Sequence, residues 1–306
     1  MINKPMDVLK DYEVRKTKKQ KTAFITAVTA FAASCRYTAK IEHGSLGCRN
    51  IVIGDAENAD YLITAHYDTC AWLPLPNLVT PFSAPLFVLY QLFLTVSLMA
   101  FALLPALIVH YLFPGSTWGR VVALLGYITV FVLVAAGPAN RHTANDNTSG
   151  VVTLLTILES LPENQRHKVC FVLFDLEEAG LLGSAAYRKA HRAATNRQIV
   201  LNMDCVGDGD EIVLIPGKRV RMNENAMKRL ESISGIWGRK SISVHKKSAI
   251  YPSDQAAFPN GVAVAAFCRS RFAGRYYSRI HTHRDTILDP TNVNILRAAL
   301  ISLISK

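Results

Sequence analysis

Charged residues are distributed unevenly along the 306-residue chain. Between residues 69 and 140, Arg120 is the only Asp, Glu, Lys or Arg. Two nearly uninterrupted apolar stretches lie in this region, at about 86–113 and 121–138. Roughly 18–20 apolar residues are enough for a helix to cross the hydrocarbon core of a bilayer. Each stretch is therefore long enough to be a membrane-spanning helix.

The two stretches are joined by a short turn, PGSTWGR, at residues 114–120. A Trp and an Arg in such a turn are typical of the membrane–water interface. The alternative, a pair of fully buried core helices, is disfavoured because core helices seldom run this long without a charge. We therefore predict an integral membrane protein with two spans, formed by a hairpin inserted at 72–140.

Outside the hairpin, short apolar runs alternate with segments of helical periodicity. The pattern predicts helices at 17–34, 151–161, 181–188 and 292–305, and strands at 37–41, 50–54, 61–65, 169–175, 198–203, 211–215, 242–244 and 262–267. This alternation predicts one α/β domain from residues 1–71 and 141–306, with a mixed, mostly parallel sheet flanked by helices. Residues 16–35 have a basic start like a signal peptide, but their apolar positions favour an amphipathic surface helix.

The charge and the cysteines limit the partners and the compartment. The formal net charge is +11, carried almost entirely outside the hairpin, which favours anionic lipid headgroups as a partner surface. No basic motif interleaved with aromatic residues supports binding of nucleic acid. The six cysteines include no C-x-x-C pair and are typical of a reducing compartment. We therefore expect the larger domain to lie on the cytoplasmic side.

Chemically reactive residues cluster where the predicted strands end. In open α/β sheets, ligands bind in the crevice beyond the carboxyl ends of the strands. Each candidate lies in a short polar motif: ITAHYDT, ANDNTSG, DLEEAG, LNMDCVG and RIHTHRDT. The candidates are His66, Asp68, Asp146, Glu177, Glu178, Asp204 and His281.

Several carboxylates in one crevice cannot all stay ionised unless cations neutralise them. A mixed set of imidazoles and carboxylates suits zinc, with manganese or cobalt as alternatives. Two divalent ions about 3.5–4 Å apart can share one bridging carboxylate. The adjacent Glu177 and Glu178 then have a simple interpretation, in which one binds metal and the other moves a proton.

Taken together and in this order, the five motifs resemble peptidase family M28, the co-catalytic zinc peptidases. The resemblance runs from about residue 50 to the C-terminus, interrupted by the hairpin. It implies a zinc aminopeptidase fold of the phosphorylase/hydrolase type with two zinc ions. One ion would be held by His66, Asp146 and Asp204, and the other by Asp146, Glu178 and His281.

The resemblance also implies the remaining roles. Glu177 would be the general base, and Asp68 would hydrogen-bond the far nitrogen of His66. Asp285 would do the same for His281, which fits the motif better than His283. The expected activity is aminopeptidase cleavage of peptides by a metal-activated water. The alternatives are a one-zinc acyltransferase similar to glutaminyl cyclase, and a non-catalytic binding protein with a peptidase fold.

Two further features qualify this interpretation. The hairpin separates His66 from Asp146, so both of its ends should leave the domain beside the crevice, which would then face the membrane. An arginine cluster at 269–284 is either a solvated basic face or a site for an acidic group of the substrate or a lipid phosphate.

Overall fold

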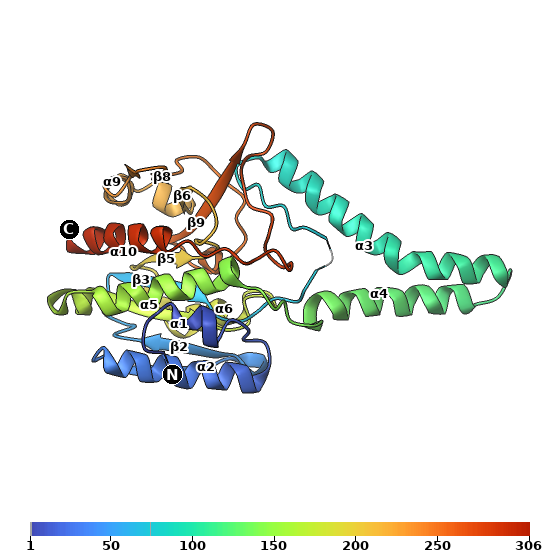
Figure 1. Ribbon diagram of the computed structural model, residues 1–306, viewed down its shortest axis with the longest axis horizontal. Helices are drawn as coiled ribbons and strands as arrows, with labels where there is room; N and C mark the ends of the chain where they lie inside the picture. The colour runs from blue at the N-terminus through green and yellow to red at the C-terminus, as the bar shows by residue number, and fades with distance from the viewer. Residues whose placement is uncertain (1, 74) are drawn as a thin grey trace.

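The computed structural model describes residues 2–73 and 75–306. Figure 1 shows a body of helices packed around one sheet, from which two long helices project. The sheet has ten strands in the order β1-β2-β4-β3-β5-β9-β6-β8-β7, with β10 paired to β9. The strands are β1 Ala39–His43, β2 Arg49–Ile53, β3 Tyr61–His66, β4 Val169–Phe174, β5 Ile199–Met203, β6 Glu211–Pro216, β7 Gly235–Trp237, β8 Lys240–Val244, β9 Gly261–Ser270 and β10 Gly274–Tyr276.

Helices cover both faces of this sheet and complete the α/β fold predicted from the sequence. The long helices α2, α5 and α10 contribute to the largest apolar cluster, and α6 contributes Tyr187 to a smaller one. The helices are α1 Asp7–Asp11, α2 Lys18–Ser34, α3 Ala84–Leu112, α4 Trp118–Ala136, α5 Gly150–Ser160, α6 Leu182–Ala190, α7 Arg192–Thr195, α8 Lys218–Arg221, α9 Glu224–Glu231 and α10 Pro290–Ser305. The helix predicted at 17–34 is α2, which begins after a capping box between Thr17 and Gln20.

Strand β4 shows why the apolar runs of the sequence become central strands. Phe171 and Leu173 pack into the cluster on one face, and Val172 and Phe174 into the cluster on the other. A strand buried on both faces needs apolar residues at successive positions. The sheet is mixed as expected, but parallel pairing is concentrated in its centre, along β4-β3-β5-β9. Antiparallel pairs at the edges, such as β1 with β2, follow from short connections that cannot form a parallel crossover.

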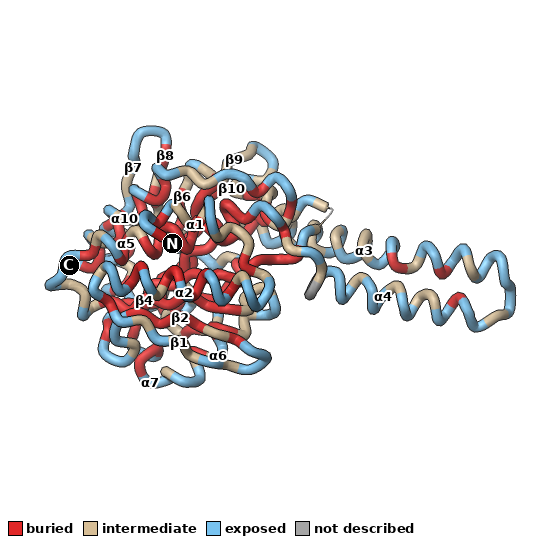
Figure 2. Tube along the Cα trace, turned by 60° about the horizontal axis from the view of Figure 1, so that its bottom comes forward, coloured by how far each residue is buried: buried red, intermediate tan, exposed pale blue. Residues whose placement is uncertain are grey.

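Helices α3 and α4 form the hairpin. They begin two and three residues earlier than the apolar stretches predicted at 86 and 121. By length and composition, α3 is able to cross a membrane, and α4 is a shorter apolar helix. Figure 2 shows the pair standing clear of the body with most of its surface exposed. Phe101 and Phe131 are 73% and 74% exposed, a degree that is unusual for large apolar side chains on a soluble protein.

Small residues line the contact between the two hairpin helices. Ala102 and Ala106 are the buried residues of α3, one turn apart. A Cβ atom at Gly126 of α4 would collide with the carbonyl oxygen of Ala102, and one at Gly119 would crowd His110. Close backbone approach through small residues is the packing mode of membrane helices, which gain nothing by burying large apolar side chains against each other.

The base of the hairpin is fastened to the body by backbone hydrogen bonds. Ala71 and Ala139 form an antiparallel bridge, and the Asn140 amide donates to the Cys70 carbonyl at 3.1 Å. The Leu73 amide donates to the carbonyl oxygen of His281 at 2.8 Å. Both ends of the hairpin therefore leave the body next to the predicted crevice.

Candidate metal centre

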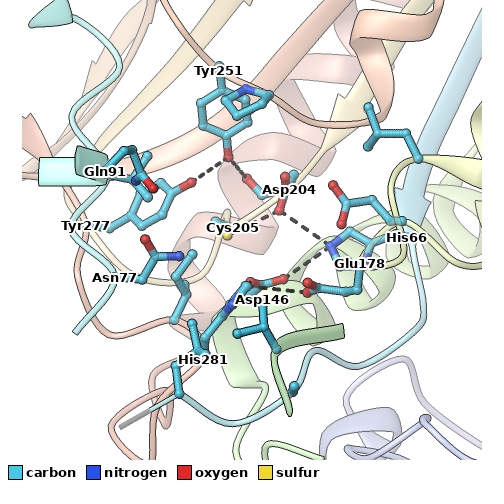
Figure 3. A pocket seen from close by; sticks show the side chains of 18 of the residues that line it. His66, Asn77, Gln91, Asp146, Glu178, Asp204, Cys205, Tyr251, Tyr277 and His281 are labelled. Carbon is cyan, nitrogen blue, oxygen red and sulfur yellow. Dashed lines mark hydrogen bonds and ion pairs between the residues drawn. The ribbon is translucent and has the colours of Figure 1, made fainter. Parts of the chain in front are cut away.

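The predicted site residues come from different loops and lie in one pocket. His66 ends β3, Glu177 and Glu178 follow β4, and Asp204 follows β5, so the parallel centre of the sheet places all of them at one edge. Asp146 lies in a tight turn before α5, and His281 lies in the loop after β10. Figure 3 shows the side chains of His66, Asp146, Glu178, Asp204 and His281 converging on a common space. Glu177 lines the same pocket.

Asp146 lies between the two imidazoles, with one oxygen toward each. Its Oδ1 is 3.2 Å from His66 Nε2, which is also 3.8 Å from Asp204 Oδ1. Its Oδ2 is 3.0 Å from His281 Nε2, which is 3.5 Å from Glu178 Oε1. Ligand atoms about 2.0–2.2 Å from a tetrahedral zinc ion lie about 3.3–3.6 Å apart. The donors of His66, Asp146 and Asp204 all lie within 4.8 Å of one another, so this part of the chain fits a metal ion. In the second set, both distances from His281 Nε2 are also short enough for shared coordination.

Asp68 and Asp285 contact the candidate ligands or the backbone that carries them. Asp68 Oδ1 is 3.5 Å from His66 Nδ1, longer than a normal hydrogen bond, and its oxygens accept the backbone amides of Glu177 and Glu178 at 3.0 and 3.2 Å. Asp285 accepts the backbone amides of Asn145 and Asp146 at 2.7 and 3.0 Å. Asp285 was predicted to hydrogen-bond His281. Instead, its two bonds fix the turn that carries Asp146.

The buried carboxylates strongly perturb each other's proton affinities in the metal-free protein. Burial raises the pKa of Glu178 to about 7 and that of Glu177 well above its ordinary value. Burial alone would lower the pKa of His281, but the charge of Glu178 and the bond with Asp146 raise it to about 9. The pKa of Asp146 is lowered because bonds with both imidazoles outweigh its burial. Protons thus take the neutralising role that divalent cations are suited to fill.

Two buried cations near this edge were not anticipated from the sequence. Arg15 is fully buried, and its guanidinium donates to the carbonyl oxygens of Tyr67 at 2.5 Å and Tyr12 at 2.6 Å. Burial lowers the pKa of Arg15 to about 10, partly opposed by the charge of Asp68. Lys21 pairs with Asp175. Asp175, which precedes the two glutamates, therefore has a buried ion-pair partner and a structural role.

Three other residues in or beside the pocket were not predicted to belong to the site. The Cys70 thiol lies within 4.8 Å of donor atoms of Glu178 and His281, so it is a further candidate ligand. Cys205, next to Asp204, also lines the pocket. The Tyr251 hydroxyl donates to the Asp204 carbonyl at 3.0 Å and therefore supports that loop.

The remaining ambiguities concern basic side chains. His281 faces the pocket and His283 is exposed, as the motif favoured. Within the arginine cluster, Arg269 and Arg275 both pair with Glu211, and Arg279 pairs with Asp208. For these three arginines, pairing within the chain favours a basic face over a site for an acidic group of the substrate or a lipid phosphate.

Solved structures share this fold at low sequence identity. Porphyromonas gingivalis glutaminyl cyclase has a TM-score of 0.61 and 13% identity over 98% of this chain and 95% of that chain. A leucine aminopeptidase precursor from Bacteroides thetaiotaomicron VPI-5482 has a TM-score of 0.59 and 14% identity over 98% and 93%. LapA aminopeptidase of Legionella pneumophila has a TM-score of 0.55 and 13% identity over 98% and 68%.

The sequence comparisons give the family directly. No curated protein matches this sequence. The family model described as Peptidase family M28 matches residues 129–303, which is more than half of the chain and includes Glu177, Glu178, Asp204 and His281. By this match, and with the fold and the candidate metal centre in agreement, the chain belongs to peptidase family M28.

Proposed function

We propose that the protein is a membrane-anchored aminopeptidase that binds two divalent cations, zinc in the first instance. The observation that carries the proposal is the placement of Asp146, whose two oxygens face two different imidazoles. A third donor accompanies each imidazole, Asp204 on one side and Glu178 on the other. This arrangement supports two cation positions joined by one carboxylate.

Zinc at these positions would polarise the scissile carbonyl and make a water molecule more acidic. The chain's own contribution centres on Glu177, which lines the pocket and is held by its backbone bond to Asp68. Its carboxylate accepts a proton from the attacking water and returns it to the leaving amine. Water adds across the amide bond, so the C–N bond breaks and a free amino acid and a shortened peptide are formed.

A glutaminyl-cyclase-like acyltransferase is the second candidate, because solved cyclases share the fold. Such a reaction requires one zinc ion. Here His281 Nε2 also lies 3.0 Å from Asp146 Oδ2 and 3.5 Å from Glu178 Oε1, which supports a second cation position. The second set favours hydrolysis. It also argues against a purely binding role, for which neither the donors nor Glu177 would be needed.

We also propose that α3 and α4 anchor the protein in a bilayer as two spans, with the pocket beside the membrane and the body in the cytoplasm. The exposed apolar surface and the small-residue contact between the helices support this anchor. Phe87, Gln91 and Leu94 of α3 also line the pocket, which supports its position next to the bilayer.

The decisive experiment combines metal analysis with a substrate panel on the full chain in lipid nanodiscs. We expect two zinc ions per chain, cleavage of aminoacyl amides with a free amine, no cleavage of their N-acetyl forms, and loss of activity with a chelator. One ion per chain together with cyclisation of N-terminal glutamine would favour the acyltransferase. Full metal loading without any turnover would favour a binding protein.

A further inference from the structure

A second cavity lies between the two hairpin helices, and it adjoins the metal pocket. It has a volume of about 600 Å³, within the range of about 300–1,000 Å³ found for pockets that enclose small ligands. We call it the interhelical cavity. It is lined by Trp72, Leu73, Leu75, Ser97, Leu98, Phe101, Val130, Leu133, Val134 and Pro138.

The interhelical cavity and the metal pocket share two wall residues, Leu73 and Val134. Leu73 is hydrogen-bonded through its amide to the backbone of His281, a candidate metal ligand. The cavity exists because α3 and α4 lie together at their far ends and diverge toward the body (Figure 1). A molecule held at the candidate ligands therefore has an apolar space beside it, leading between the hairpin helices.

The chemistry of the lining identifies what could occupy this space. Among the lining residues that the structure describes, only Ser97 and Trp72 carry polar side-chain groups. The backbone groups of α3 and α4 are largely used within the helices. A peptide segment placed here would leave its own amides without partners, which is costly in an apolar site. A hydrocarbon chain has no such groups and fits the lining without penalty.

We propose that the interhelical cavity holds a hydrocarbon chain of the substrate, so that the enzyme acts on amino-acid amides that carry such a chain. The amphipathic substrate would reach the pocket from the bilayer, with its amide at the metal centre and its chain between α3 and α4. Hydrolysis breaks the amide C–N bond, water supplies the hydroxyl of the acid, and a long-chain amine leaves. This inference rests on the proposed aminopeptidase function and narrows its substrate class.

The test compares leucine n-butylamide with leucine n-dodecylamide, using the full chain in nanodiscs. Burying each methylene favours binding by about fourfold. We therefore expect kcat/KM to be at least about tenfold higher for the dodecyl substrate, from about two buried methylenes. Ser97→Trp and Val130→Trp fill the cavity from opposite walls. Each should reduce this ratio to less than about threefold, because less than one methylene of the dodecyl chain would still be buried.

Partition of the longer chain into the bilayer would raise the ratio in every variant alike. The matched control is Leu124→Trp, which places the same side chain on an exposed position of α4 outside the cavity. It should keep the wild-type ratio. The proposal would be overturned if the ratio of kcat/KM for the dodecyl and butyl amides were the same in the wild type and all three variants. It would also be overturned if a leucine tripeptide gained as much in kcat/KM over the butyl amide as the dodecyl amide does.

The outcomes separate this inference from the proposed function. Hydrolysis of the butyl amide without a chain-length effect would retain the aminopeptidase and reject the hydrocarbon site. If neither amide is hydrolysed, the proposed function fails, and binding is tested by photocrosslinking with a leucine dodecylamide that carries a terminal diazirine. Crosslinks to cavity residues such as Leu98 or Val130 would support the site. Crosslinks confined to the outer faces of α3 and α4 would overturn it.

Discussion

Proton competition at His281 gives a quantitative test of the metal centre. In the metal-free chain, the charge of Glu178 and the bond with Asp146 overcome the effect of burial and raise the pKa of His281 to about 9. A metal ligand must be a neutral imidazole. At pH 7, about one chain in a hundred has His281 in that form, so binding at this position is weakened by about 3 kcal/mol.

Below pH 9, the zinc affinity of this position should therefore increase about tenfold for each unit by which the pH is raised, because the competing proton becomes easier to displace. Isothermal titration of zinc into the metal-free chain, between about pH 6.5 and 8 and in two buffers of different ionisation enthalpy, measures both the affinity and the protons released. We expect His281 to release about one proton per chain at pH 7. Glu178, with a pKa raised to about 7, should add part of another.

The same shift makes an opposite prediction for stability without metal. The raised pKa means that charged His281 stabilises the metal-free fold fully below its ordinary value of 6.5, and this contribution disappears as the pH rises through about 9. Metal-free protein should thus lose stability over the interval in which metal affinity grows. The control is His283→Gln at an exposed position, which should leave both trends unchanged. A pH-independent affinity without proton release would refute the reasoning.

Three further changes test separate parts of the site. Glu177→Gln should lower kcat by about 10²–10⁴-fold, because proton transfer is lost, while metal content measured by mass spectrometry stays at the wild-type value; near-normal turnover would exclude Glu177 as the base. Arg15→Met should lower the free energy of unfolding by about 3 kcal/mol, because buried carbonyls lose their donor. Thermal unfolding measures this, with Lys19→Met at an exposed position as the control. Equal thermal midpoints for the two variants would contradict the prediction. Cobalt-loaded protein should show thiolate-to-cobalt absorption that Cys70→Ser removes; identical spectra would mean that Cys70 is not a ligand.

The candidate ligands could be predicted because their positions follow from local sequence. His66, Glu178 and Asp204 each come directly or shortly after an apolar strand, and parallel strands bring such positions to one edge of the sheet. The hairpin was equally visible, because a long uncharged apolar stretch has few other interpretations. The fold class followed from the alternation of strands and helices.

Features that depend on contacts distant in the sequence could not be predicted. Arg15 is one basic residue in a basic N-terminal segment, and only the packing of that segment against the Tyr67 backbone shows it to be buried. In the sequence, nothing distinguishes Cys70 from other buried cysteines, and only the fold brings its thiol near His281. The bonds of Asp285 to the turn at Asn145 likewise join residues 140 positions apart. The short edge strands β7 and β10 carried too little pattern to be recognised.

The pairing of Ala71 with Ala139 means that the 67 residues between them, 72–138, occupy the place of a simple turn. A two-residue Asn-Gly connection has the backbone twist to join antiparallel segments at such a point. Replacing the whole hairpin in this way should leave the central strands of the sheet in place. It would also remove the Leu73 bond to the His281 backbone and the pairing of Val79 with Tyr277, so the loop that carries His281 should lose support. The shortened protein would dissolve without lipid, and its pocket would lack the wall that Phe87 and Leu94 provide. If the proposed anchor and hydrocarbon site are correct, this one segment would determine both the solubility of the protein and its choice of substrate.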